Sequence, residues 1–230
     1  MNVNVFQRVE QKYILSKEQK NSFLEKAQDW LVKDPYFESK ICNIYFDNNN
    51  NDLIVSSLEK PMFKAKVRLR SYDVPDMDSK VFLEVKDKYK GLVGKRRIKL
   101  SLKEFYDYYE KGYIENNQIM KELNYYFNKF DLKPFMFLAY DRNSYYEKDN
   151  RNLRITFDHN LRSRSDNLRL ELGDNGQKYF TDDTYIMEIK VLNAMPLWLT
   201  RILSELKIYP TSFSKVGSIY SKEKESECLC

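Results

Sequence analysis

The chain has 230 residues, of which 42% are hydrophobic and 32% are charged, and its formal net charge is +5. This excess is too small for a nucleic-acid coat protein, so the placement of the charges is more informative than their sum, and no nucleic-acid partner is predicted. The hydrophobic content allows a folded core, and the presence of only 6 Gly and 6 Pro argues against a low-complexity, disordered chain.

The cysteines and the single histidine narrow the chemistry. Cys42, Cys228 and Cys230 have no disulfide-framework spacing, which argues against a disulfide-stapled secreted domain. Cys228 and Cys230 form a CxC that suits either a two-ligand metal site or, more simply, spare thiols in a frayed tail. His159 is the only histidine, which argues against His-based zinc catalysis and a Ser-His-Asp triad.

Neither a signal peptide nor a run of 18 apolar residues is present, so a cytoplasmic protein without a membrane segment is predicted. In chain order, the first strand is expected at 5–14. The Ser16/Gln19 capping box then predicts a helix to about Leu31. Four more strands are expected at 41–46, 62–73, 80–88 and 93–100. The polar run that begins at Asp47 is predicted to be a loop.

A second capping box, Ser101 with Glu104, predicts a helix that ends near Gly112, and another helix is expected at 115–130. The β pattern then returns with a hairpin over 135–146 and 153–158, a strand at 185–192 and a last helix that begins at Pro196. No linker rich in Gly, Ser or Pro divides the chain. We therefore expect a single domain over 1–221 and a disordered polar tail over 222–230.

Charged side chains recur at every second position of most predicted strands. In KVRLR, for example, Lys66, Arg68 and Arg70 share one face, because alternate residues of a strand point the same way. Apolar residues such as Val67 and Leu69 occupy the alternate positions. The full collection comprises Arg8, Glu10 and Lys12; Lys66, Arg68 and Arg70; Glu84 and Lys86; Lys95 and Arg97; Tyr140 and Arg142; Arg154, Thr156 and Asp158; and Glu188 and Lys190.

Two interpretations fit these charged faces. The simpler one is the wet side of an antiparallel sheet. The other is a barrel whose outer face is apolar under helices and whose lumen holds the charged set. Two like charges 4 Å apart repel by about 4 kcal/mol at an effective dielectric constant of about 20, so such a lumen requires anions. A triphosphate or a phosphate chain would match its Arg and Lys residues, and its carboxylates would hold a divalent metal.

These residues resemble those of the triphosphate tunnel metalloenzymes. Within that group the chain is most similar to the VTC domain, the polyphosphate polymerase domain of the vacuolar transporter chaperone family and its bacterial relatives. The segments that carry the resemblance run in family order: RVEQKY (8–13), NIYFDN (43–48), KVRLRSY (66–72), FLEVKDK (82–88), GKRRIKL (94–100), YDRNSY (140–145), LRITFD (153–158), YIMEIK (185–190) and SFSKVGSIY (212–220). The resemblance implies an α+β fold, an antiparallel β-barrel tunnel with helices packed on its outside.

The resemblance also implies residue roles. Phosphate would be bound by Lys12, Arg68, Arg70, Lys86, Lys95, Arg142, Arg154, Lys190 and Lys215, with Tyr140 and Ser214 nearby. Lys66 and Arg97 share these faces without an equally clear family match and stay open. Glu188, with Glu10 as a second candidate, would hold Mn²⁺ or Mg²⁺. The implied catalytic set is Arg68, Arg70, Lys86, Glu188 and Lys190.

The activity implied is transfer of the γ-phosphate of ATP onto a growing polyphosphate chain. A tunnel-type triphosphatase that hydrolyses inorganic or organic triphosphate, and a non-catalytic polyanion-binding module, are the alternatives. The chain differs from the eukaryotic complex in lacking its SPX domain and membrane segments. Neither inositol-phosphate control nor coupled translocation is therefore expected, although a membrane partner is left open.

Overall fold

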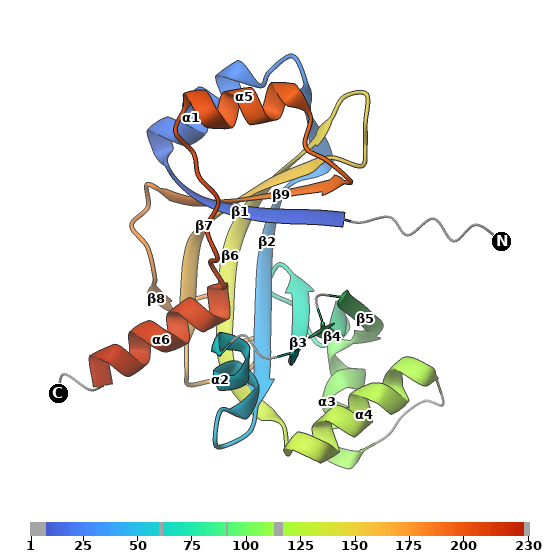
Figure 1. Ribbon diagram of the computed structural model, residues 1–230. Helices are drawn as coiled ribbons and strands as arrows, with labels where there is room; N and C mark the ends of the chain where they lie inside the picture. The colour runs from blue at the N-terminus through green and yellow to red at the C-terminus, as the bar shows by residue number, and fades with distance from the viewer. Residues whose placement is uncertain (1–7, 60–61, 91, 113–116, 228–230) are drawn as a thin grey trace. The chain divides into compact units, whose positions relative to one another are not determined.

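The computed structural model describes residues 8–59, 62–90, 92–112 and 117–227. These residues divide into two compact units, each of which is assembled from three segments of the chain (Figure 1). Unit 1 comprises the described residues of Met1–Ser39, Tyr140–Leu161 and Lys178–Phe213, and unit 2 those of Lys40–Ala139, Arg162–Gln177 and Ser214–Cys230. The expected single domain spans both units and stays a prediction.

Nine strands form the sheet of the described residues: β1 Arg8–Ser16, β2 Leu31–Asp47, β3 Phe63–Tyr72, β4 Lys80–Tyr89, β5 Leu92–Ser101, β6 Lys133–Glu147, β7 Arg154–Arg164, β8 Gln177–Lys178 and β9 Thr184–Leu192. The hydrogen-bonded order is β1-β9-β7-β6-β2-β3-β4-β5, and β8 pairs with β7. The pairs β1–β9, β7–β9, β2–β3, β3–β4 and β4–β5 are antiparallel. In the described residues β1 and β5 are the two ends of this order, so the sheet is not closed by backbone hydrogen bonds.

Six helices accompany the strands: α1 Lys17–Lys26, α2 Asp52–Leu58, α3 Leu102–Lys111, α4 Gln118–Phe130, α5 Leu197–Glu205 and α6 Lys215–Glu227. The predicted strands and hairpin are present, so the α+β antiparallel class is confirmed. Among the helices of the described ranges, none combines the length and the hydrophobicity that a membrane span requires.

The core of unit 1 lies between the apolar strand faces and the helices α1 and α5, which lie beside each other (Figure 1). Phe23 of α1 meets Phe157 of β7 edge to face, with ring centroids 5.9 Å apart. Trp198 of α5 is half-buried and packs against this core. Its ring stacks on Trp30 at 5.1 Å, and its indole N–H donates to Glu147 Oε1 over 2.7 Å. The apolar stripe of α5 therefore covers one side of this sheet.

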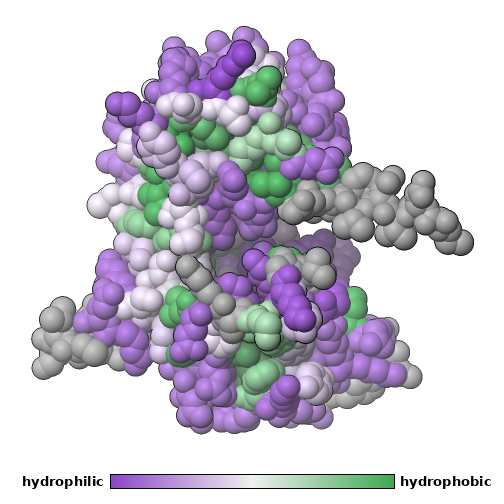
Figure 2. Space-filling model, viewed as in Figure 1, coloured by the Kyte–Doolittle hydropathy of each residue, from purple (hydrophilic) through white to green (hydrophobic). Residues whose placement is uncertain are grey.

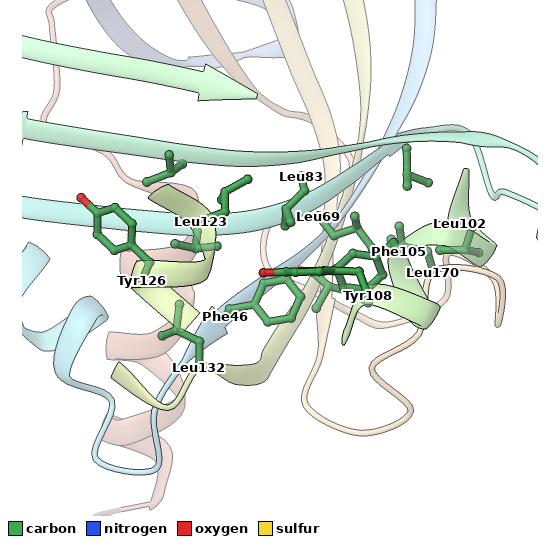
Figure 3. Close-up of a cluster of buried hydrophobic side chains, with 14 of the residues drawn as sticks. Phe46, Leu69, Leu83, Leu102, Phe105, Tyr108, Leu123, Tyr126, Leu132 and Leu170 are labelled. Carbon is green, nitrogen blue, oxygen red and sulfur yellow. The ribbon is translucent and has the colours of Figure 1, made fainter. Parts of the chain in front are cut away.

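The core of unit 2 is built in the same way from α3 and α4. Leu69 of β3 and Leu83 of β4 are fully buried, and they face Phe105 of α3 and Leu123 of α4 (Figure 3). Because strand side chains alternate, burying these residues turns the charged positions of β3 and β4 to the other face of the sheet. The prediction that helices cover the apolar face is confirmed for this unit.

Hydrophilic side chains cover most of the face seen in Figure 2, in keeping with the 32% of charged residues. Some large apolar side chains of the described residues are exposed to solvent. The most exposed of them are Tyr36, Met62, Leu197 and Tyr209. Isolated exposed apolar residues of this kind are normal on a protein surface.

Both predicted capping boxes are present. The Ser16 side chain accepts from Gln19 N, and Ser101 Oγ accepts from Glu104 N at 3.1 Å while Glu104 Oε2 accepts from Ser101 N at 2.7 Å. A capping box satisfies two backbone donors that the first helical turn leaves without partners. These two helix starts could therefore be located from local sequence alone.

We expect Ser101→Ala to destabilise the fold, because the first turn of α3 loses its cap. A lost N-cap costs about 1 kcal/mol, which corresponds to roughly 2–4 °C in melting temperature for a chain of this size. Thermal unfolding followed by circular dichroism measures the shift. Ser204→Ala, at an exposed position of α5, is the matched control and should leave the melting temperature nearly unchanged. Equal melting of both variants and the wild type would contradict the capping role.

Five elements differ from expectation. The helix expected to reach about Leu31 ends at Lys26, and β2 already begins at Leu31. The short helix α2 was not predicted. Its first N–H groups donate to Asp47, which accepts from Leu53 N and Ile54 N at 2.9 and 2.8 Å, and this residue lies too far before the helix to form a recognisable capping pattern. Strand β8 is two residues long and carries no periodic signal. Helix α6 occupies part of the expected tail, as far as Glu227, and residues 228–230 lie outside the described residues.

Candidate functional site

The charged positions of β2–β5 lie on one face of unit 2, opposite its helix-covered core. Register places Tyr45, Arg68, Glu84 and Arg97 in one row across the four strands. A second row joins Lys66, Lys86 and Lys95 across β3, β4 and β5, and Asn43 pairs with Arg70. We call these residues the basic face of unit 2: Asn43, Tyr45, Lys66, Arg68, Arg70, Glu84, Lys86, Lys95 and Arg97.

Glu84 lies at the centre of the basic face and is only 1% exposed. Its Oε2 accepts from Arg68 Nε at 2.8 Å and lies 2.7 Å from Arg68 NH2, so the guanidinium binds it through one edge. Lys95 Nζ lies 3.0 Å and Arg97 NH1 3.9 Å from Glu84 Oε1. Burial alone would raise the pKa of Glu84, but Arg68, Arg70 and Lys95 outweigh it and lower that pKa to about 2. One ionised carboxylate therefore holds three cations in place.

Two polar side chains of β2 fix the arginines from the other side. Arg70 Nε donates to Asn43 Oδ1 at 2.8 Å, and Asn43 is itself fully buried. Arg68 NH1 donates to the Tyr45 hydroxyl at 3.1 Å, and Tyr45 is 8% exposed. Each arginine is thus held by a buried side chain before any anion arrives, which is what a preorganised anion site needs.

The Tyr45 hydroxyl lies in a strongly positive field. Burial opposes ionisation of its phenol, but Arg68, Arg70 and Lys66 favour the phenolate more, and they lower the pKa of Tyr45 to about 8. Above that pH a phenolate beside Arg68 would add a negative charge to the basic face. Anion binding should therefore weaken as the pH rises through about 8.

We expect Tyr45→Phe to remove this alkaline loss of affinity, because phenylalanine cannot ionise. Titration of tripolyphosphate affinity between pH 7 and 9 by calorimetry measures it in both proteins. Tyr108→Phe is the matched control, since Tyr108 donates to Asn124 Oδ1 and burial raises its pKa to about 12. A wild type whose affinity stays constant across this range, or a Tyr45→Phe profile that matches it, would contradict the prediction.

Helix α6 brings a further group to this face. Lys66 Nζ donates to Ser214 Oγ at 2.9 Å, although the two residues are 148 positions apart, and Ser214 Oγ also accepts from Gly217 N at 3.3 Å. Lys215 is the first residue of α6 and is half-buried. The structure thus brings Ser214 to Lys66, whose role the sequence left open. Arg97 joins the face as well, with its guanidinium 4.6 Å from the centre of the Phe82 ring.

The charged positions of β1, β9 and β7 likewise share one face of unit 1. Lys12 lies opposite Glu188, which lies opposite Thr156, and Glu10 lies opposite Lys190. Arg154 of β7 lies directly opposite Lys190 of β9. With Tyr140, Arg142 and Asp158, these residues form what we call the charged face of unit 1: Glu10, Lys12, Tyr140, Arg142, Arg154, Thr156, Asp158, Glu188 and Lys190.

Arg142 is held by Asp158 through two parallel hydrogen bonds. Its Nε donates to Oδ1 at 2.6 Å and its NH2 to Oδ2 at 2.8 Å, while NH2 also lies 3.7 Å from Glu188 Oε2. Burial works against the charge on Arg142, but Asp158 outweighs it and raises the pKa of the guanidinium well above its ordinary value. The Tyr140 ring lies 5.3 Å from the Arg142 guanidinium. Arg142 is therefore permanently charged and rigidly oriented.

The two predicted metal ligands, Glu188 and Glu10, lie on the paired strands β9 and β1. Glu188 is 7% exposed and lies 3.4 Å from Lys190 Nζ, and Glu10 is on the neighbouring strand on the same face. Thr156, directly opposite Glu188, is 2% exposed, and its hydroxyl has no hydrogen-bond partner among the described residues. Within those residues no group of three or more His, Cys, Asp and Glu gathers. Two carboxylates and a hydroxyl suit a hard cation that takes its remaining ligands from phosphate and water.

Other predicted phosphate ligands make contacts of their own. Lys12 Nζ donates to the Phe213 carbonyl at 3.2 Å. Arg154 NH2 lies 3.5 Å from Ser144 Oγ and 3.4 Å from Asp34 Oδ2, and this side chain is half exposed. Lys86 is exposed on the basic face of unit 2. Each predicted site residue thus lies on one of the two charged faces or, as Ser214 and Lys215, at the start of α6.

Sequence reasoning assigned no role to five residues of these faces: Asn43, Tyr45, Glu84, Thr156 and Asp158. Glu84 and Asp158 belong to the alternating charge pattern, so a signal for them existed. Tyr45 and Asn43 carry no formal charge, and only their pairing with Arg68 and Arg70 marks them. The hydroxyl and amide are identified as supports of the arginines by their hydrogen bonds alone.

Comparisons with known proteins agree with this architecture. The model of the VTC domain family matches residues 7–221. A candidate adenylate cyclase from Bacillus halodurans has a similar structure, with a TM-score of 0.54 and 15% identity over 90% of this chain and 93% of that one. A candidate adenylyl cyclase from Hippeastrum, for which a dominant triphosphatase activity is described, has a TM-score of 0.55 and 14% identity over 94% of this chain and 96% of that one. No curated protein sequence matches the chain significantly. The fold is that of the triphosphate tunnel proteins.

Proposed function

The chain belongs to the VTC domain family, and on that premise we propose that it is a metal-dependent polyphosphate polymerase. The reaction would transfer the γ-phosphate of ATP onto the end of a polyphosphate chain. The observation that carries the proposal is the basic face of unit 2, where Arg68, Lys95 and Arg97 gather around the buried Glu84.

The charge balance of that face supports a phosphate ligand. Its cations are Lys66, Arg68, Arg70, Lys86, Lys95 and Arg97, whereas Glu84 is its carboxylate. Arginine binds phosphate oxygens through its planar fork, and lysine does so as a compact charge. The ammonium groups of the lysines in one row across three strands repel one another. A bound polyanion would offset this repulsion and so stabilise the face.

Phosphoryl transfer needs little covalent help from the protein, and positioning with charge neutralisation does most of the work. Arg68, Arg70 and Lys86 would hold the phosphates of the nucleotide, while Arg142 and Lys190 would stabilise the charge that develops during transfer. Glu188 and Glu10 would hold Mn²⁺ or Mg²⁺, and the ion would supply positive charge that offsets the charge of the phosphates.

During transfer, the bond between the γ-phosphorus and the β–γ bridging oxygen breaks. A new bond forms to an oxygen of the terminal phosphate of the chain, and ADP leaves. That acceptor oxygen is already anionic at neutral pH, so the reaction needs no strong general base. A protein with a single histidine is suited to such chemistry.

Incubation with ATP and Mn²⁺, followed by gel and chromatographic separation of the products, tests the proposal. Long phosphate chains with a stoichiometric amount of ADP are the expected products. Release of inorganic phosphate alone would contradict the polymerase and would favour hydrolysis. Omission of the metal should stop the reaction, and Mg²⁺ in place of Mn²⁺ shows which ion serves better. A cytoplasmic location stays a prediction from the sequence.

A triphosphatase is the second candidate, because the Hippeastrum protein of similar fold is described with that activity. Both activities would use the same phosphate-binding side chains, and they differ in whether water or a phosphate oxygen attacks. Supplying tripolyphosphate without nucleotide separates them, since only the triphosphatase would convert it to shorter phosphates. Tight phosphate-chain binding without any metal-dependent turnover would instead indicate the non-catalytic module.

A further inference from the structure

Three aromatic side chains of unit 1 form a cluster outside its core. Tyr179 and Phe180 follow β8, and Phe213 comes from the segment before α6. The ring centroids of Tyr179 and Phe180 lie 4.6 Å apart, those of Phe180 and Phe213 5.6 Å, and those of Tyr179 and Phe213 6.1 Å. We call these three residues the aromatic cluster.

The aromatic cluster does not belong to the apolar packing that holds unit 1 together. All three rings are half-buried, and among the described residues none of them packs against the unit's core, whereas Tyr185 and Trp198 do. Aromatic rings gathered at a surface without a core beneath them are typical of binding sites. The cluster therefore calls for an explanation other than fold stability.

Backbone contacts connect the aromatic cluster to the charged face of unit 1. Lys12 Nζ donates to the carbonyl of Phe213 at 3.2 Å, and Thr211 N donates to the carbonyl of Lys12 at 2.7 Å. Lys12 lies directly opposite Glu188 in the β1–β9 pair. The segment that carries Phe213 thus contacts, through its backbone, a lysine of the face that would bind phosphate and metal.

We propose that the aromatic cluster is a base-stacking site, which receives the nucleobase of the nucleoside triphosphate, with Lys12 as the phosphate ligand nearest to it in the chain's contacts. This inference rests on the proposed function, since it specifies where the substrate's base is bound. A nucleobase has a flat π-face, and the triphosphate attached to its sugar is charged, so the nucleotide matches rings whose segment contacts Lys12 of a charged face. Every nucleobase has a π-face that can stack on a ring, so the site would accept adenine and guanine alike.

The test compares two ligands that differ only in the base-bearing part. Phe213→Leu removes one ring and retains the carbonyl that binds Lys12. Calorimetry with a nonhydrolysable ATP analogue and with inorganic tripolyphosphate should show about 5- to 150-fold weaker binding of the analogue, because loss of one stacking ring typically has this effect. Tripolyphosphate affinity should stay within about twofold of the wild type, since no base is involved.

Tyr209→Leu is the matched control, because Tyr209 lies in the same segment and is 71% exposed. Its affinity for both ligands should equal that of the wild type. Phe180→Leu is a second variant with the same expected outcome as Phe213→Leu, and circular dichroism establishes that each protein is folded. Unchanged analogue affinity in both ring variants, or equal losses for both ligands, would overturn the base-stacking site and leave the proposed function intact. A wild type that binds neither ligand would overturn both.

Discussion

Replacing Glu84 by glutamine is expected to cause the largest loss of stability of any single substitution on the charged faces. Glu84 is buried and is surrounded by Arg68, Lys95 and Arg97, so loss of its charge leaves three cations facing one another. Breaking a buried ion pair by removing one partner costs roughly 3–5 kcal/mol. Chemical denaturation at pH 7 measures this loss, and Glu110→Gln, at an exposed position of α3, should cost almost nothing.

The pH dependence of stability gives a second measurement on Glu84. Its pKa in the folded protein is lowered to about 2, below the ordinary value of 4.5. The stability that it contributes is therefore fully present above about pH 4.5 and is lost as the pH falls toward 2. Glu84→Gln should show a shallower acid loss across this window than the wild type. Parallel acid limbs in the two proteins would contradict the role of Glu84.

The effect of tripolyphosphate on the melting temperature shows whether Glu84 lies where a phosphate ligand would bind or only supports the fold. A bound polyanion would supply the negative charge that Glu84→Gln has lost. We therefore expect millimolar tripolyphosphate to raise the melting temperature of the variant more than that of the wild type. An equal rise in both would mean that the anion binds away from the basic face of unit 2.

Glu188→Ala is expected to abolish metal-dependent turnover while the protein still binds phosphate. Glu188 and Glu10 are the carboxylates that would hold the cation, so we expect turnover to fall by about 100-fold or more, the range seen when a charge-stabilising group is removed. Phosphate binding should persist or strengthen without metal. Phosphate binding is retained because the substitution removes a negative charge beside Arg142 and Lys190.

Rate measurements with saturating ATP and Mn²⁺, paired with tripolyphosphate calorimetry in a chelator, separate the two effects. Glu205→Ala, an exposed carboxylate that pairs with Lys26 at 2.8 Å, is the control and should keep full activity. Turnover of Glu188→Ala within tenfold of the wild type would exclude Glu188 as a metal ligand. Loss of phosphate binding together with turnover would point instead to a structural role for this side chain.

The sequence by itself determined which residues share a face and where several elements begin. A two-residue period assigns Arg68 and Arg70 to one face and Leu69 to the other, because strand geometry is local. The capping boxes at Ser16 and Ser101 depend on residues three positions apart, so they too were visible. The order of the segments around these residues was sufficient to identify the VTC domain family, whose model matches residues 7–221.

Only the tertiary structure decided which charges meet. Arg68 binds Glu84 and Tyr45, and Lys66 binds Ser214, because strand register and the start of α6 bring together residues 16 to 148 positions apart. Helix α2 likewise escaped prediction, since the Asp47 that caps it lies in the preceding strand. Periodicity and capping follow from neighbouring backbone geometry, which a sequence displays directly. Partners across a sheet depend on how distant segments pair, and that is settled by packing of the whole core.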